Sequence, residues 1–221
     1  MTTPDMTIAD LVARLHNEAT SQMPADMFAT FQAEQARMRA YGVPPGAATV
    51  GDTIPDVELL DVHGNPTSFR AAQAGAAAVV VLYRGEWCPY CNIALRTYQE
   101  DLLPTLDDRG IKLIAISPQK PDRSLSTREK NELSFVVLSD PGNQVATALG
   151  VLTAHSDEVK EVQRAIGIDV AGSNLDGTHT VPIPTVAVID SQATVRWIDI
   201  HPDYATRTEV EEILEGLKAL R

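Results

Sequence analysis

Two cysteines three positions apart are the residues of this sequence best suited to chemistry, and they lie in the run Trp87-Cys88-Pro89-Tyr90-Cys91. The run follows an apolar stretch and opens a predicted helix. A thiol at a helix start faces unpaired N–H groups and the positive end of the macrodipole, which predicts a lowered pKa for Cys88. Pro89 suits the first helical position because it has no N–H to lose, and Cys91 lies one turn further on the same face. We therefore expect Cys88 to attack as a thiolate and Cys91 to close a disulfide with it.

A Cys-x-x-Cys pair also occurs in zinc sites and in inert cores. Zinc would need two further ligands, and no two histidines of the chain have a short ligand spacing: they are His16, His63, His155, His179 and His201. Two inert thiols on one helix turn beside a tryptophan would be a coincidence. A pair placed between a strand and a helix favours dithiol redox chemistry, so we expect no metal.

The elements that must position the pair alternate between strands and helices. Continuous apolar residues at 77–83 predict a strand buried on both faces, and a helix over 88–108 follows it. The pattern further predicts strands at 111–116, 135–138, 185–189 and 194–198, helices at 122–132, 141–149, 156–166 and 206–220, and a hairpin of 57–61 with 67–69. Strand–helix–strand repeats predict an α/β fold with parallel strands and right-handed crossovers.

Two amphipathic stretches at 7–22 and 26–41 precede this pattern and predict a helical hairpin. A run rich in Gly and Pro follows them and predicts a linker. We therefore divide the chain into an N-terminal helical extension (1–42), a linker (43–50) and an α/β domain (51–221). The hairpin could cap its own domain or serve as the arm of a homodimer, and composition does not decide between the two.

Charge and hydropathy exclude several function classes. Eighteen basic against 30 acidic residues give a net charge of −12, which argues against a nucleic-acid partner. The longest apolar run, residues 76–83, is far shorter than the roughly 20 residues of a membrane span. The first residues lack the pattern of a secretory signal, so we expect a cytoplasmic protein. No nucleotide- or flavin-binding pattern occurs, so we expect no cofactor and electrons supplied by a protein or small-molecule thiol.

A second feature is the run Ile183-Pro184-Thr185 before a predicted strand. A cis proline there would lack an N–H and present neighbouring backbone groups to the disulfide. An ordinary proline at the entrance of a strand is the alternative.

Five motifs in chain order resemble one family. They are residues 51–59, 83–91, 139–143, 184–190, and 202–204 together with Arg207. In this order they resemble the peroxiredoxin-like branch of the alkyl hydroperoxide reductase/thiol-specific antioxidant (AhpC/TSA) family over roughly residues 50–221, and the helical N-terminus resembles the extension that such proteins carry. The resemblance implies a thioredoxin-like fold, a central mixed sheet flanked by helices, and thiol-dependent peroxide reduction. Cys88 then falls on the peroxidatic position, Cys91 resolves it within the chain, and Pro184 falls on the thioredoxin cis-proline.

The sequence departs from this family at two positions. Gly85 stands where the family has the Thr or Ser that holds the peroxide, and Pro184 stands where it has an activating Arg. Arg84, Arg196 or Arg207 could replace that Arg, although a surface ion pair is the alternative role for each. A nearby Glu86 carboxylate would oppose thiolate formation. The candidate site-shaping residues are Arg84, Gly85, Glu86, Trp87, Pro89, Tyr90, Pro184 and Thr185.

Two activities follow from these residues. The first is a peroxidase for hydrogen peroxide or organic hydroperoxides, reduced in turn by a thiol of the thioredoxin or glutathione type. The second is a thioredoxin- or glutaredoxin-like oxidoreductase for protein or small-molecule disulfides, which the lost Thr and Arg and the Cys-Pro-Tyr-Cys run favour. A redox-sensing module without catalysis is a further alternative.

Overall fold

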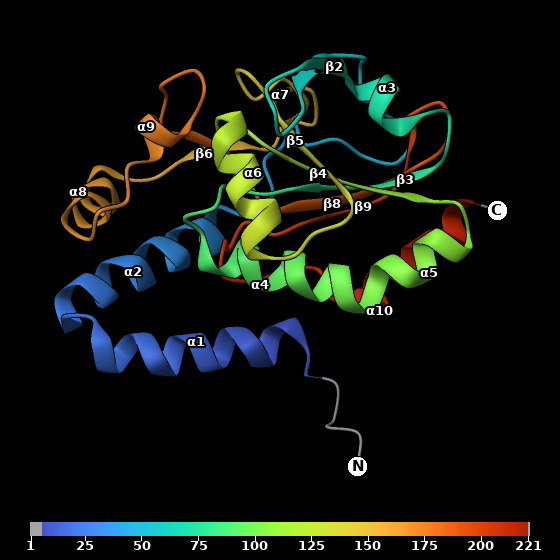
Figure 1. Cartoon of the computed structure of the whole chain (residues 1–221). Helices are drawn as coiled ribbons and strands as arrows, with labels where there is room; N and C mark the ends of the chain where they lie inside the picture. Colours follow the sequence, from blue (N-terminus) through green and yellow to red (C-terminus); the bar gives the residue numbers. More distant parts are fainter. Residues whose placement is uncertain (1–5, 221) are drawn as a thin grey trace.

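The computed structural model describes residues 6–220, and its centre is a mixed sheet with the strand order β2-β1-β5-β4-β3-β8-β9 (Figure 1). The strands β3, β4 and β5 are parallel, and β8 runs antiparallel to β3. The bounds are β1 (Glu58–Leu60), β2 (Pro66–Ser68), β3 (Ala78–Leu82), β4 (Lys112–Ser117), β5 (Val136–Ser139), β8 (Thr185–Ile189) and β9 (Val195–Ile200). This arrangement confirms the expected α/β fold with a central mixed sheet.

Strand β3 lies at the middle of the sheet, and all five of its residues are buried. Val79 and Val81 face the core under the helix that carries the cysteines, whereas Val80 and Leu82 face a second core on the other side. Burial on both faces explains why the strand reads as a continuous apolar run. Its C-terminal end leads directly into the cysteine motif.

Helices cover both faces of the sheet. One face carries α4 (Pro89–Thr97), η1 (Tyr98–Leu102), α5 (Leu103–Asp108), α6 (Pro121–Lys130) and α10 (Val210–Gly216), which continues into η2 (Leu217–Leu220); the other carries α3 (Phe69–Gln73) and α7 (Gln144–Ala148). The helix predicted over 88–108 is therefore interrupted by the π-helical segment η1. Pro104, in the first turn of α5, cannot donate an N–H to the preceding turn, which accounts for the local widening.

A small second sheet lies at one end of the molecule. It pairs β6 (Leu152–Ala154) with β7 (Thr180–Pro182), and the segment between them contains α8 (Asp157–Ala165) and α9 (Val170–Ser173). The sequence pattern predicts only a helix and a loop here, because three-residue strands are too short to show a period. The pairing brings His155 close to the cysteine motif.

The N-terminal helices α1 (Ile8–Gln22) and α2 (Ala25–Tyr41) pack on α4 and α8 of the same chain. The Glu209 carboxylate accepts hydrogen bonds from the first two N–H groups of α1 at 2.9 and 2.8 Å, and Arg39 of α2 pairs with Asp203. The hairpin is thus a cap on its own chain in this structure. None of the helices within residues 6–220 is long and apolar enough to cross a membrane.

Candidate active site

The two thiols lie at the junction between the end of β3 and the start of α4. Cys88 is the N-cap residue of α4, and Cys91 lies one turn further, with its N–H donating to the Cys88 carbonyl at 3.1 Å. Both residues are only 1% exposed, and both thiols are free. Pro89 occupies the first turn of α4, as predicted. Such a pair is close enough for sulfur chemistry within the chain and is shielded from water.

Arg207 is the cation that reaches both sulfurs. Its Nη2 lies 3.0 Å from the Sγ of Cys91 and 3.6 Å from the Sγ of Cys88. Its Nη1 donates to the carbonyl oxygens of Tyr204 and Thr206 at 2.5 and 2.6 Å. One side of the guanidinium is therefore anchored on its own loop, which aims the other side at the thiols.

The loop that carries Arg207 is held from two directions. The buried Tyr98 hydroxyl donates to the carbonyl of Thr208 at 2.6 Å, and the Thr208 hydroxyl donates to Asp199 at 2.9 Å. The sequence pattern placed 206–220 in one helix, but α10 begins only at Val210. The loop conformation before it is what frees the Tyr204 and Thr206 carbonyls to bind the guanidinium.

Electrostatics favour a negative charge on the inner sulfur of the pair. Burial opposes ionisation of both thiols, but the hydrogen bond from Cys88 and the charges of Arg207 and Arg84 outweigh it at Cys91, whose pKa falls well below its usual value. Burial, and then the hydrogen bond and charge of Cys91, raise the pKa of Cys88. The predicted lowering of the Cys88 pKa by the helix start is therefore wrong for this arrangement. The thiols titrate as one pair that shares a proton.

Arg84 is a second cation beside the pair. It is 3% exposed, and its guanidinium lies 4.8 Å from the ring centre of Trp87 and 4.1 Å from that of Tyr204. Its Nη2 donates to Nε2 of His155. Burial, followed by the Arg84 charge, lowers the pKa of His155 to about 2, so this imidazole is neutral and can accept the bond. The Arg84 backbone N–H faces the Cys91 sulfur at 3.5 Å.

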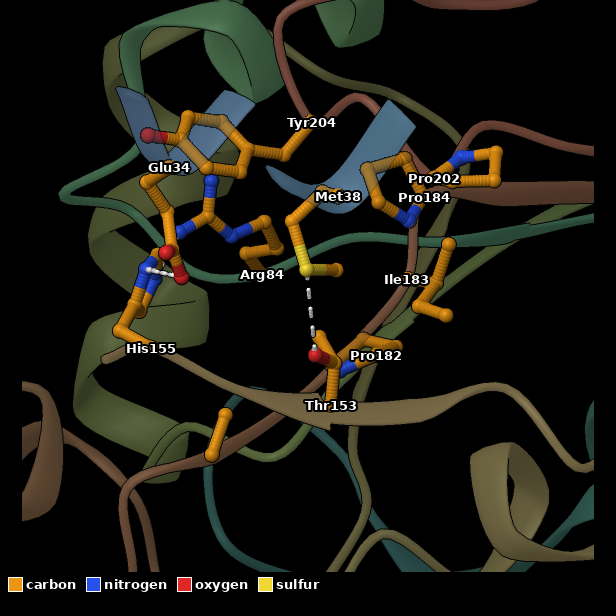
Figure 2. Close-up of a pocket in the computed structure, with 11 residues that line it drawn as sticks. Glu34, Met38, Arg84, Thr153, His155, Pro182, Ile183, Pro184, Pro202 and Tyr204 are labelled. Atoms are coloured by element: carbon orange, nitrogen blue, oxygen red, sulfur yellow. Dashed lines mark hydrogen bonds and ion pairs between the residues drawn. The ribbon is translucent and has the colours of Figure 1, made fainter. Parts of the chain in front are cut away.

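Helix α2 contributes a buried carboxylate next to this cation. Glu34 is 4% exposed, accepts two bonds from Arg37 at 2.8 Å, and lies 3.9 Å from Nδ1 of His155 (Figure 2). No motif of the sequence points to Glu34, and His155 stands out there only as one of five possible zinc ligands. The one available signal is that Glu34 falls on the helical stripe of Phe31 and Met38, where a charge is out of place.

Gly85 has no room for the hydroxyl residue of the family pattern. Its φ of +147° is a conformation that L residues rarely adopt, and a Cβ would lie 2.6 Å from Nε1 of Trp87. The Trp87 ring therefore occupies the space that a Thr or Ser side chain would need.

The Glu86 carboxylate pairs with cations of α6. It lies 2.7 Å from Arg123 and 3.6 Å from Lys130. A Glu86 carboxylate would oppose thiolate formation only from close by, and here its charge is balanced by Arg123 and Lys130. Arg196 pairs with Asp190 at 2.6 Å and has the surface role given as its alternative.

Pro184 and Thr185 lie at the entrance of β8. Pro184 borders a small space of about 10 Å³ together with Cys91 and Arg207, so it is close to the pair as expected. No peptide bond among residues 6–220 is cis, so of the two alternatives Pro184 takes the second, an ordinary trans proline at the entrance of a strand. The Thr185 hydroxyl donates to the Ile183 carbonyl at 2.8 Å rather than toward the sulfurs.

Tyr90 connects the motif to the N-terminal hairpin. Its hydroxyl lies 2.9 Å from Nε2 of His16 on α1 and accepts a bond from Gln35 on α2 at 3.4 Å. Burial and then the nearby Cys88 charge raise the pKa of Tyr90 to about 12, so the phenol stays protonated. Within residues 6–220 no three His, Cys, Asp or Glu side chains are grouped to hold a metal.

Comparison with known proteins places these features in a family. A model described as the AhpC/TSA family matches residues 50–198. A putative peroxiredoxin of Mycobacterium tuberculosis is 31% identical over 118 residues, which are 53% of this chain and 74% of that protein. Peroxiredoxin Bcp of Escherichia coli is 24% identical over 76% of this chain and 94% of its own length.

Solved structures share the fold. Peroxidoxin BcpB from Mycobacterium tuberculosis superposes with a TM-score of 0.59 and 21% identity, over 78% of this chain and 97% of that one. Reduced Prx3 from Vibrio vulnificus gives a TM-score of 0.61 with 17% identity, over 77% and 99%. Because the family model covers more than half of the sequence and these structures share its thioredoxin-like fold, the chain belongs to the AhpC/TSA family.

Proposed function

We propose that this protein is a thiol-dependent peroxidase in which Cys88 is the nucleophile and Cys91 the resolving thiol. One observation carries the proposal: in a member of the AhpC/TSA family, the half-buried Arg207 guanidinium lies 3.0 and 3.6 Å from the two sulfurs. A cation at that distance stabilises a thiolate, and the thiolate is the form of cysteine that attacks an O–O bond.

Access to the sulfurs supports this division of roles. Cys88 borders a cavity of about 410 Å³, whereas Cys91 borders a space of about 10 Å³, which is room for no more than about one water. A peroxide therefore meets Cys88 first. The pair holds one proton and one negative charge, so moving the proton from Cys88 to Cys91 makes the accessible sulfur the thiolate.

The two thiols supply both electrons that reduce the peroxide. The Cys88 thiolate attacks the terminal oxygen of ROOH, the S–O bond forms, the O–O bond breaks, and the leaving RO⁻ takes the proton of Cys91 to give ROH. The Cys91 thiolate attacks the Cys88 sulfenic acid, the S–S bond forms, and the expelled hydroxide takes a solvent proton to give water. Two electrons have passed from the dithiol to the peroxide.

An external thiol must return the two electrons. We propose a donor of the thioredoxin or glutathione type, which attacks the disulfide by thiol exchange. Reduction of protein disulfides has less support as the main activity, because the chain matches the AhpC/TSA family over residues 50–198. A homodimer through the N-terminal helices and the division of the chain at residues 42 and 50 stay predictions.

Rapid mixing of the reduced protein with hydrogen peroxide tests the proposal, with tryptophan fluorescence as the signal. We expect oxidation far faster than that of an ordinary free cysteine, and an ordinary rate would contradict the peroxidase. Cys91→Ser should trap a sulfenic acid on Cys88, detected with dimedone and mass spectrometry. Cys88→Ser is the matched control, and a sulfenic acid that formed only on its Cys91 would reverse the assigned roles.

A further inference from the structure

A cavity of about 410 Å³ lies beside Cys88, between the N-terminal hairpin and the segment that follows α8. The hairpin lines it with Leu15, Met23, Phe28 and Phe31, and Ile166 and Ile168 face it from the other side. Volume and lining match those of sites that bind small apolar molecules, which combine hydrophobic walls with a few polar groups.

The polar end of this cavity is the reaction centre itself. Cys88 and Trp87 form part of the lining, and the buried Arg84 and His155 border it as well. A ligand with an apolar body and a reactive polar end would place that end against the Cys88 sulfur. The cavity is therefore shaped for one orientation of such a molecule.

One wall of the cavity, the hairpin, comes from a part of the chain outside the matched family region. The model of the family begins at residue 50, whereas α1 and α2 end at Gln22 and Tyr41. Contacts hold these helices in place over the pair, among them those from His16 and Gln35 to Tyr90. The hairpin is thus a wall of the active site added to the shared fold.

We propose that this cavity is the binding site for the organic group of the substrate, and that the hairpin selects hydroperoxides with a bulky apolar group over hydrogen peroxide. The inference rests on the proposed peroxidase function and deepens it. Hydrogen peroxide has no apolar part, so it gains nothing from these walls. An arylalkyl hydroperoxide buries its ring there while its O–O bond meets Cys88, and the reaction remains the balanced one above.

Filling the cavity tests the inference. Ala19 lines it from α1, whereas Ala29 of α2 is exposed and lies outside it, so Ala19→Phe and Ala29→Phe form a matched pair. The readout is the ratio of kcat/KM for cumene hydroperoxide to kcat/KM for hydrogen peroxide. We expect Ala19→Phe to lower this ratio about tenfold or more, as loss of fit in an apolar pocket does, and Ala29→Phe to leave it near that of the unmodified protein. An equal ratio in all three proteins would overturn the inference.

A binding measurement keeps the inference testable if Ala19→Phe fails to fold. The probe is 2-phenyl-2-propanol, the alcohol that cumene hydroperoxide yields, titrated into the unmodified protein with fluorescence from the Trp87 wall as the signal. Saturable binding supports the site, and no binding overturns it. The two proposals fail differently: slow oxidation by both peroxides overturns the peroxidase and this inference with it, whereas fast oxidation with an unaltered ratio overturns this inference alone.

Discussion

Replacing Arg207 by Met removes the cation that both sulfurs share. The side chain is half-buried, and its Nη2 lies 3.0 Å from the Cys91 sulfur. Met fills a similar volume without charge. The pKa of the Cys91 thiol is low partly because of this guanidinium, so its loss should raise the pKa of the pair.

The size of the effect follows from the contact that is lost. A hydrogen bond to a charged group contributes about 1.5–3 kcal/mol, and one pKa unit corresponds to about 1.36 kcal/mol. Arg207→Met should therefore raise the first pKa of the pair by about one to two units. The thiolate forms above its pKa, so the rise moves the onset of thiolate formation to higher pH. Arg84 remains beside the pair and keeps the shift from growing larger.

Thiolate absorbance at 240 nm, followed against pH in the reduced protein, measures this shift. Arg196→Met is the control, because that guanidinium pairs with Asp190 instead of a sulfur and its loss should leave the midpoint in place. Arg207→Lys keeps the positive charge but loses the guanidinium that the Tyr204 and Thr206 carbonyls hold in place, so we expect an intermediate titration midpoint. If Arg207→Met folds, as judged by circular dichroism, and titrates at the same midpoint as the unmodified protein, then the guanidinium does not stabilise the thiolate and the reasoning fails.

Two further predictions concern the motif itself. Gly85→Thr restores the hydroxyl of the family pattern, but we expect lower kcat/KM for hydrogen peroxide and a loss of about 1–3 kcal/mol in stability, because φ is +147° and the new Cβ would lie 2.6 Å from Trp87 Nε1. Faster turnover with an unchanged melting temperature would contradict this. Glu86→Gln should leave the 240 nm midpoint within about 0.3 units, because the carboxylate is paired with Arg123 at 2.7 Å; a clear fall in the midpoint would show that its charge reaches the thiols.

Much of the fold could be predicted from local pattern. The apolar run at 77–83 has one stable solution, a strand buried on both faces, and β3 occupies 78–82. Interruptions were not visible, because the π-helical segment Tyr98–Leu102 keeps a helical spacing of apolar residues. The strands β6 and β7 depend on pairing with each other across more than twenty residues, and short strands paired over such a distance have no local signature.

The site residues could be predicted only where the reactive groups and the helix that positions them belong to one short sequence motif. The two cysteines, the proline after the first one and the helix start could all be read from five consecutive residues. Arg207 could be named as a candidate but not chosen, because its position depends on the loop before α10, and the sequence pattern predicts helix from residue 206 onward. The charge distribution between the thiols was predicted wrongly, since the helix start favours Cys88 whereas the tertiary contacts favour Cys91.

Pro184 carries no charge at the strand entrance, where the family resemblance implies an arginine, and the cation at the thiols is Arg207 instead. Arg207 lies on the loop after β9, so its position depends on that loop being rigid. Helix α2 holds the loop in place through two contacts. Arg39 pairs with Asp203, and the Tyr204 hydroxyl donates to the Phe31 carbonyl at 3.3 Å. The same helix also lines the cavity beside Cys88. The hairpin that precedes the family region thus stabilises the loop of Arg207 and also lines the cavity beside Cys88. A change in the hairpin should therefore alter both thiolate stabilisation and substrate access, which couples the two properties in this member of the family.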